Sequence, residues 1–160
     1  MIFPEFLKEN DLIGVTAPSA GLDEDHLVGY LKSLEHFHAR GWQVTETANV
    51  RLPQLPSSSG AQRARELKGL AQDSRVKMIW CAAGGDFLVE MLPDTDFEAL
   101  RANPKWVQGY SDPTGLLFPL TTKYDVATIY GPNAGGFDME PLHPALKNSL
   151  DILSGRLPVQ

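Results

Sequence analysis

Short apolar runs alternate with segments of helical periodicity, and this alternation limits the possible folds more than any other feature of the chain. Leu12–Ala17 is apolar, partly β-branched and stopped by Pro18, so it predicts a buried strand followed by a turn. Val76–Ala82 is the strongest strand signal in the sequence. Between these runs, Asp23–Arg40 has apolar residues at helical spacing, an acidic first turn and a stop signal at Gly41, which together predict a helix.

The rest of the chain continues this alternation. We expect further strands at 42–47, 105–109 and 126–130, and further helices at 61–72, 87–91, 96–102, 114–122 and 144–153. The buried stripe of the first helix should consist of Leu27, Leu31, Leu34 and either Phe37 or His38. Because each connection is long enough for a crossover helix, the pattern predicts a mostly parallel sheet with helices on both faces. This is a three-layer α/β fold of the flavodoxin-like or Rossmann-like kind. Residues 1–153 should form the domain, and 154–160 should begin a linker.

Composition excludes several classes of protein. The 160 residues are 21% charged and 42% hydrophobic, which argues against a disordered chain. The formal net charge is −6 and no basic run occurs, so nucleic acid and anionic membranes are not expected as partners. A single cysteine fits a reducing compartment, and no apolar run is long enough to span a membrane. Since residues 1–10 do not resemble a secretion signal, we expect a cytoplasmic protein.

Unusual residues follow three of the predicted strands, in segments 17–21, 83–86 and 109–112. Ligands bind at the carboxyl ends of strands in open α/β sheets, so these segments are expected to share one crevice. Ser111 stands between a predicted strand and a predicted helix, where a sharp turn would lift its hydroxyl above the sheet as a nucleophile requires. Alternatively, Ser111 or Asp112 caps the helix, with Pro113 at its first position. Pro113 also replaces the second glycine of the hydrolase pattern Gly-x-Ser-x-Gly.

Gly84 and Gly85 follow the strongest predicted strand. Their amides could form half of an oxyanion hole or hold a phosphate, or the pair could simply make a tight turn. Asp86 lies in the same loop, where it could contact a ligand or only solvent. Neither a Gly-x-Gly-x-x-Gly nor a P-loop pattern follows, and the four histidines do not form a metal-ligand set. We therefore expect neither a cofactor nor a metal ion, and we interpret Cys81 as a core residue.

Seven short segments, taken in order, resemble a known family. They are Gly14–Ser19, Ala61–Ala64, Val76–Asp86, Leu92–Pro93, Asn103–Lys105, Gly109–Asp112 and Tyr130–Pro132. Together they are similar to LD-carboxypeptidase A and its relatives, the S66 serine peptidases, which include the microcin C immunity peptidase.

The resemblance implies a Ser-His-Glu triad in which Ser111 attacks an amide carbonyl and forms an acyl-enzyme. It also implies that the backbone amides of Asp112 and Gly85 hold the oxyanion. Gly84, Asp86 and Ser19 would line the substrate crevice, for a peptide or peptidyl-conjugate substrate.

Two departures from the family pattern affect this expectation. The family's His and Glu come from a C-terminal domain that this sequence does not reach, so we expect an N-terminal domain that is nearly inactive alone. Loss of the base from a triad costs about 10⁴- to 10⁶-fold in rate.

The second departure concerns the substrate, because Ala83 stands where muropeptide-trimming members carry Arg. With Asn133 after Tyr-Gly-Pro, this is closer to the microcin-immunity branch and favours a peptide–nucleotide type of amide over a murein tetrapeptide.

Two other interpretations remain open. The chain could be a non-catalytic α/β module that binds a small molecule or peptide in the same crevice. It could also be a folding fragment whose exposed interdomain face associates with itself. On that ground we expect a homodimer.

Overall fold

All five strands of the central sheet run parallel. The strands are β1 (Leu12–Thr16), β2 (Gln43–Glu46), β3 (Val76–Cys81), β4 (Trp106–Gly109) and β5 (Ile129–Tyr130), in the order β2-β1-β3-β4-β5. The computed structural model of the chain describes residues 1–156. The strand order is that of flavodoxin-like doubly wound sheets, so the predicted fold class is confirmed.

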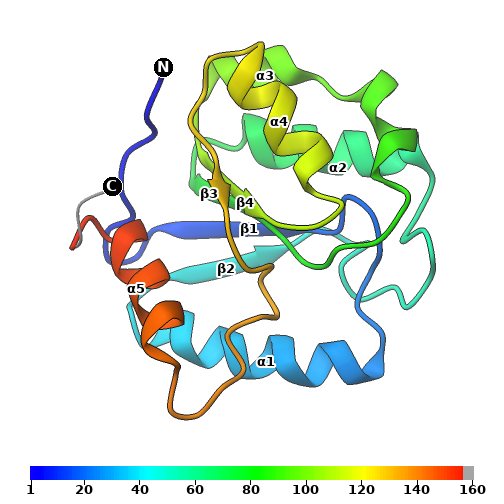
Figure 1. Cartoon of the computed structure of the whole chain (residues 1–160). Helices are drawn as coiled ribbons and strands as arrows, with labels where there is room; N and C mark the ends of the chain where they lie inside the picture. The colour runs from blue at the N-terminus through cyan, green and yellow to red at the C-terminus, as the bar shows by residue number, and fades with distance from the viewer. Residues whose placement is uncertain (157–160) are drawn as a thin grey trace.

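Helices cover both faces of the sheet (Figure 1). One face carries α1 (Glu24–His38) and α5 (Pro144–Leu153), and the other carries α2 (Gly60–Gln72), α3 (Phe97–Ala102), α4 (Thr114–Thr122) and the 3₁₀ helix η1 (Leu88–Asp94). Alternate residues of β3 enter different cores. Met78 and Trp80 pack under α1 and α5, whereas Ile79 packs under the other helices. Both faces of the sheet are therefore buried, as a parallel sheet requires.

The carboxyl ends of β1 and β3 lie side by side at the centre of the sheet. The two strands pair in register from Ile13 with Met78 to Thr16 with Cys81. Beyond this pair, Ala82 N donates to the carbonyl of Thr16 at 2.8 Å. In this topology the chain leaves these two strands in different directions, and the divergence forms the usual ligand crevice of such sheets.

Local capping signals explain why several helix boundaries were predicted to within one or two residues. Pro144 opens α5 at its first turn, and His143 caps it by accepting a hydrogen bond from Ala145 N at 3.2 Å. Ser59 caps α2 by accepting from Gln62 N. The positive φ of Gly41, +80°, lets the chain turn directly after α1.

Two expectations from sequence were wrong. The fifth strand is two residues long rather than five, because Ile2 pairs with Val126 and takes its backbone hydrogen bonds. The expected stripe of α1 is right at Phe37, which is buried, and at Leu27 and Leu34, which are half-buried against the same core. It is wrong at Leu31, which is 44% exposed, while Tyr30 and Ser33 are buried instead. Ser33 is inside because its hydroxyl accepts a hydrogen bond from the backbone of the 131–143 loop.

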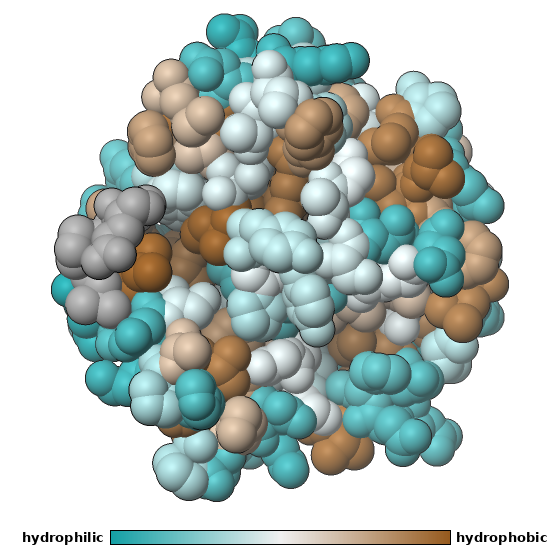
Figure 2. Space-filling view, viewed as in Figure 1, coloured by the Kyte–Doolittle hydropathy of each residue, from teal (hydrophilic) through white to brown (hydrophobic). Residues whose placement is uncertain are grey.

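The surface mixes apolar and polar residues. Figure 2 shows hydrophobic residues in several separate patches on one face, surrounded by hydrophilic ones. The exposed apolar side chains include Met1, Phe3, Phe118 and Tyr130, near the N-terminal segment, α4 and the edge strand β5. None of the helices within residues 1–156 combines the length and apolar character that a membrane crossing requires.

Candidate active site

Ser111 forms a sharp turn between β4 and α4. Its φ is +65°, in the left-handed region that residues with a side chain rarely occupy. Its carbonyl accepts hydrogen bonds from the backbone N–H and the hydroxyl of Thr114, at 2.9 and 2.5 Å, which starts α4. The Ser111 side chain is exposed, and its hydroxyl has no hydrogen-bond partner within residues 1–156. The capping alternative is therefore not what the structure shows.

Gly84 lies directly beside this hydroxyl. A β-carbon built on Gly84 would lie 3.3 Å from both Cβ and Oγ of Ser111. Any side chain here would fill the space in front of the hydroxyl. Gly85 is constrained differently, because its φ is +138° and a β-carbon would lie 2.3 Å from Oγ of Ser19. The first glycine thus keeps space open, and the second permits the turn.

Two side chains hold the loop after β3 by its backbone N–H groups. Ser19 Oγ accepts from Phe87 N at 3.0 Å, and Asp112 Oδ2 accepts from Leu88 N at 2.9 Å. Sequence reasoning placed Ser19 in the crevice lining. In the structure Ser19 is completely buried and its hydroxyl supports this loop. Both contacts bring the diglycine segment toward the Ser111 turn.

Arg63 is a site-supporting residue that sequence reasoning noted only as part of the family resemblance. Its side chain is fully buried on α2, and Nη1 donates to the carbonyls of Pro18 and Phe87, each at 2.9 Å. Nη2 donates to Glu90 Oε2 at 2.7 Å. The guanidinium therefore ties the loop after β1 to the loop after β3. The sequence did contain a signal for this role, because Arg63 lies on the face of α2 whose other buried residues are apolar.

Two backbone amides are unpaired in the segments that carry Gly84 and Ser111. Within residues 1–156, the backbone N–H groups of Gly85 and Asp112 have no acceptor. Gly85 follows Gly84 and Asp112 follows Ser111, and a β-carbon on Gly84 would lie 3.3 Å from Ser111 Oγ. Free amides next to a serine hydroxyl are the components of an oxyanion hole. Asp86 is exposed at the rim of the same loop.

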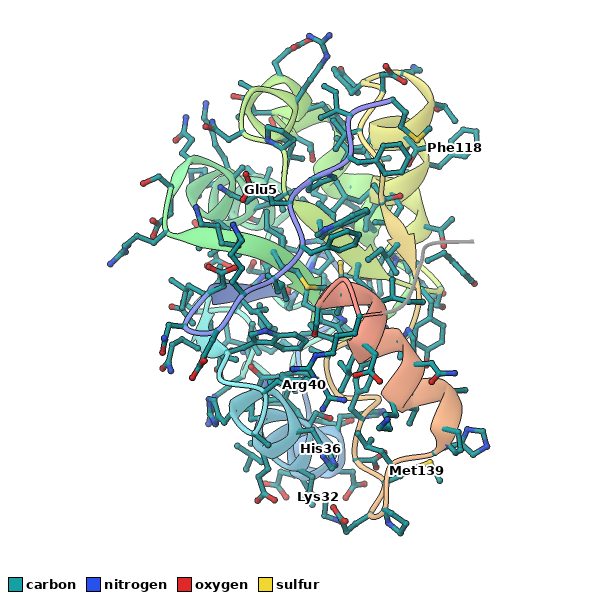
Figure 3. All side chains as sticks on the ribbon, turned by 90° about the vertical axis from the view of Figure 1, so that its left-hand side faces the viewer. Glu5, Lys32, His36, Arg40, Phe118 and Met139 are labelled. Atoms are coloured by element: carbon teal, nitrogen blue, oxygen red, sulfur yellow. The ribbon has the colours of Figure 1, made fainter. Side chains whose placement is uncertain are left out.

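None of the four histidines is hydrogen-bonded to Ser111 in the described part of the chain. The backbone N–H of His26 and then its ring, whose Nδ1 lies 2.6 Å from Asp23 Oδ1, lower the pKa of the Asp23 carboxyl. His36 bonds the carbonyl of Met139 at 3.2 Å, between α1 and the loop before α5 (Figure 3). His143 caps α5. A triad base is therefore not in place within residues 1–156.

A cleft of about 360 Å³ extends from the site toward α1. Gly84, Tyr110 and Asn133 line one end, and Lys32 and Asp138 line the α1 side. A larger hollow, of about 550 Å³, lies at the amino ends of the strands, beside residues 103–105 and the N-terminal segment. It contains none of the predicted site residues, so the smaller cleft is the one that the site chemistry can use.

An exposed serine on a sharp strand-to-helix turn above a parallel sheet is a feature of α/β serine hydrolases. Residues 13–131 match the family Peptidase_S66, described as the LD-carboxypeptidase N-terminal domain. The chain therefore belongs to the LD-carboxypeptidase (S66 peptidase) family and corresponds to its N-terminal domain.

Individual relatives agree with this assignment. The chain is 32% identical over 133 residues to a Vibrio cholerae protein named as an inferred carboxypeptidase, covering 82% of this chain and 40% of that protein. It is 30% identical over 127 residues to the microcin C7 self-immunity protein MccF of Escherichia coli, covering 79% and 37%. A solved structure of MccF with aspartyl sulfamoyl adenosine has a TM-score of 0.85 and 26% identity, covering 96% and 47%. The chain thus spans about 40% of the length of these curated relatives.

Proposed function

We propose that the chain is the nucleophile-bearing domain of an LD-carboxypeptidase-like serine peptidase and that Ser111 attacks an amide carbonyl. The observation that carries the proposal is that an exposed, left-handed Ser111 lies next to Gly84, where a β-carbon would be only 3.3 Å from the hydroxyl oxygen. A non-glycine residue with positive φ is unfavourable and persists where the surroundings impose it. Here the strained turn exposes the Ser111 hydroxyl next to Gly84, which lines the cleft.

In the proposed reaction, Ser111 Oγ bonds to the carbonyl carbon and transfers its proton to a base. The tetrahedral oxyanion accepts hydrogen bonds from the amides of Gly85 and Asp112, which have no other acceptor within residues 1–156. One such donor is worth about 10²- to 10³-fold in rate. The C–N bond then breaks, the amine leaves with the proton, and water hydrolyses the acyl-enzyme.

The base and its orienting carboxylate are proposed to be His and Glu of a second, C-terminal domain. The part of the relatives that this chain does not cover is large enough for such a domain. The 160 residues alone should then hydrolyse amides about 10⁴- to 10⁶-fold more slowly than the complete triad. Asp86, exposed beside Gly85, is proposed to line the substrate crevice, and Ser19 to position the loop.

The proposed substrate is a peptidyl or aminoacyl amide, such as a peptide–nucleotide conjugate. Ala83 puts no cation beside the glycine pair, and MccF has been solved with aspartyl sulfamoyl adenosine. A muropeptide is the second candidate substrate. The net charge of −6 and the fully buried single cysteine fit a cytoplasmic protein without a nucleic-acid partner.

Amide hydrolysis followed by mass spectrometry tests this proposal. The chain is assayed alone and fused to the part of Escherichia coli MccF that lies beyond the matched region. The substrates are an L-Lys–D-Ala muropeptide and an aspartyl-adenylate-type amide. We expect turnover only in the fused, folded protein. Turnover should be lost in Ser111→Ala and retained in Ser74→Ala, because Ser74 is an exposed serine at the amino ends of the strands.

A non-catalytic binding module is the second candidate, because no base within residues 1–156 contacts Ser111. A folded fusion that binds the substrate without hydrolysing it would favour this candidate and contradict the peptidase proposal. Turnover by the 160-residue chain alone would place a base within the chain, with His143 as the first residue to test.

A further inference from the structure

The segment after β5 is fixed tightly against the sheet. The side chains of Trp80 and Gln108 both donate to the carbonyl of Pro132, at 2.8 and 2.9 Å. Ala134 N donates to a carbonyl of β3 at 2.9 Å. Asn133, between these two anchored residues, is only 7% exposed. Its backbone position is therefore set in advance of any ligand.

The orientation of the Asn133 carboxamide is set by a further hydrogen bond. Tyr110 N donates to Asn133 Oδ1 at 3.2 Å. Since an N–H needs an acceptor, the oxygen must be the atom that faces Tyr110, and Nδ2 must point the other way. Nδ2 has no acceptor within residues 1–156. Nδ2 is not among the buried polar atoms without a partner, so it reaches solvent at the cleft that Asn133 lines and is open to a ligand acceptor.

The free Nδ2 group faces the same space as the Ser111 hydroxyl. The point that a β-carbon on Gly84 would occupy lies 3.3 Å from Ser111 Oγ and 4.0 Å from Asn133 Nδ2. Both Asn133 and Gly84 line the cleft that extends to α1. A ligand group placed over Gly84 for attack by Ser111 therefore meets the Asn133 amide as well.

We propose that Asn133 is a specificity-determining residue whose Nδ2 donates a hydrogen bond to a substrate oxygen. The acceptor is a carbonyl or carboxylate oxygen adjacent to the bond that Ser111 attacks. This inference rests on the function proposed above, in which the oxyanion itself is held by the amides of Gly85 and Asp112. Asn133 then selects substrates that carry a second acceptor, because a substrate without one leaves the buried amide unpaired.

The variants Asn133→Asp and Asn133→Ala separate this role from a structural one. Asp retains an oxygen that can accept from Tyr110 N, but replaces the donor with a second oxygen. Ala removes both groups. The probe is aspartyl sulfamoyl adenosine, titrated into the 160-residue chain. Its binding is followed by calorimetry and by the side-chain NH₂ resonance of Asn133, which Asn133→Asp identifies by its disappearance.

We expect the probe to shift the Asn133 NH₂ resonance, and both variants to weaken binding at least about tenfold, while Ser74→Ala, outside the cleft, binds as the wild type does. Wild-type affinity in Asn133→Asp, with weakening only in Asn133→Ala, would overturn the proposal and leave Asn133 as an anchor for Tyr110. An unmoved NH₂ resonance at saturation, or no binding by the folded wild type, would also overturn it. The nucleophile proposal is judged separately, by the turnover of Ser111→Ala in the fused protein.

Discussion

The hydroxyl of Ser111 faces the bare Cα of Gly84, where a β-carbon would lie only 3.3 Å from the hydroxyl oxygen. The two residues follow neighbouring strands, because β3 pairs with β4 in the sheet. The candidate nucleophile and a candidate crevice residue, 27 positions apart in sequence, are thus brought together by strand order alone.

Gly84→Ala should therefore block the site without unfolding the domain. The new methyl group occupies the space of the reacting carbonyl, and displacement of a reacting group by about 1 Å costs about 100-fold in rate. Gly84 does not have a left-handed φ and its nearest neighbour is at 3.3 Å, so the fold should tolerate the methyl group. Turnover of the fused protein and thermal unfolding measure the two effects.

Gly69→Ala is the matched control, because no atom lies within 4 Å of its β-carbon on the exposed side of α2. It should leave turnover unchanged and raise the free energy of unfolding by about 0.5–1 kcal/mol, as helix propensity predicts. Equal activity in Gly84→Ala and Gly69→Ala would contradict the placement of the substrate over Gly84.

Ser19→Ala should destabilise the domain, although the side chain that it removes is small. The substitution leaves the N–H of Phe87 without its acceptor next to a fully buried position. An unsatisfied buried donor costs about 1–3 kcal/mol. Denaturant unfolding should show this loss, whereas the exposed Ser74→Ala should stay within about 0.5 kcal/mol of the wild type. Equal stability of the two variants would mean that Ser19 does not support the loop.

The cluster of Tyr30, Glu46 and Arg51 should make stability depend on pH at both extremes. Arg51 donates to both carboxylate oxygens of Glu46, at 2.6 and 2.8 Å, and holds the pKa of Glu46 below its usual value of 4.5. A lowered folded pKa stabilises the protein above pH 4.5, and this contribution is lost as the pH falls through the folded value. Burial, and then Glu46, raise the pKa of Tyr30 above its usual value of 10.0, so stability should fall as the pH rises past 10.

Urea unfolding of the wild type and Glu46→Gln, measured at a series of pH values, tests this prediction. The difference in stability should be largest above pH 4.5 and should shrink at lower pH. Other carboxylates with a lowered pKa, including that of Asp96 beside Lys68, affect both proteins equally and cancel. If the difference in the free energy of unfolding between the two proteins is constant from pH 3 to 7, the ionisation of Glu46 does not contribute to stability.

Self-association is expected through the apolar edge around β5. Met1, Phe3 and Tyr130 are each at least 60% exposed and line a hollow of about 260 Å³ beside this short edge strand. Phe118 projects from α4 at the surface (Figure 3). Sedimentation should show dimers that dissociate on dilution and that are weakened in Tyr130→Lys. A monomer at all concentrations would count against the expected homodimer.

Local signals were sufficient for most of the architecture. Caps, prolines and glycines define where α2, α4 and α5 begin or end, so these helices could be predicted closely. The length of β5 could not, because it depends on Ile2, which lies more than 120 positions away and pairs with Val126. The inward side of α1 depends in the same way on the loop that bonds Ser33. In both places a tertiary contact overrides the local pattern.

In the candidate site, too, some residues could be predicted from local signals, and others are recognised only from tertiary contacts. Ser111, Gly84 and Gly85 stand out in the sequence because they follow predicted strands. Asn133 and Arg63 act through bonds to Tyr110, Pro18 and Phe87, which no spacing along the chain reveals. Ser19 was expected to line the crevice; the fold shows that its side chain is buried and accepts a hydrogen bond from Phe87 N, a contact that no spacing along the chain reveals.

Covalent labelling of the fused protein with an alkyl fluorophosphonate tests the central claim most directly. Ser111 Oγ would bond to phosphorus, fluoride would leave, and the serine proton would pass to the base. Peptide mapping by mass spectrometry should find the label on Ser111, with none in Ser111→Ala and slower labelling in Gly84→Ala. A fused protein that hydrolyses its substrate while Ser111 stays unlabelled, or that labels at another residue, would contradict the claim that Ser111 is the nucleophile.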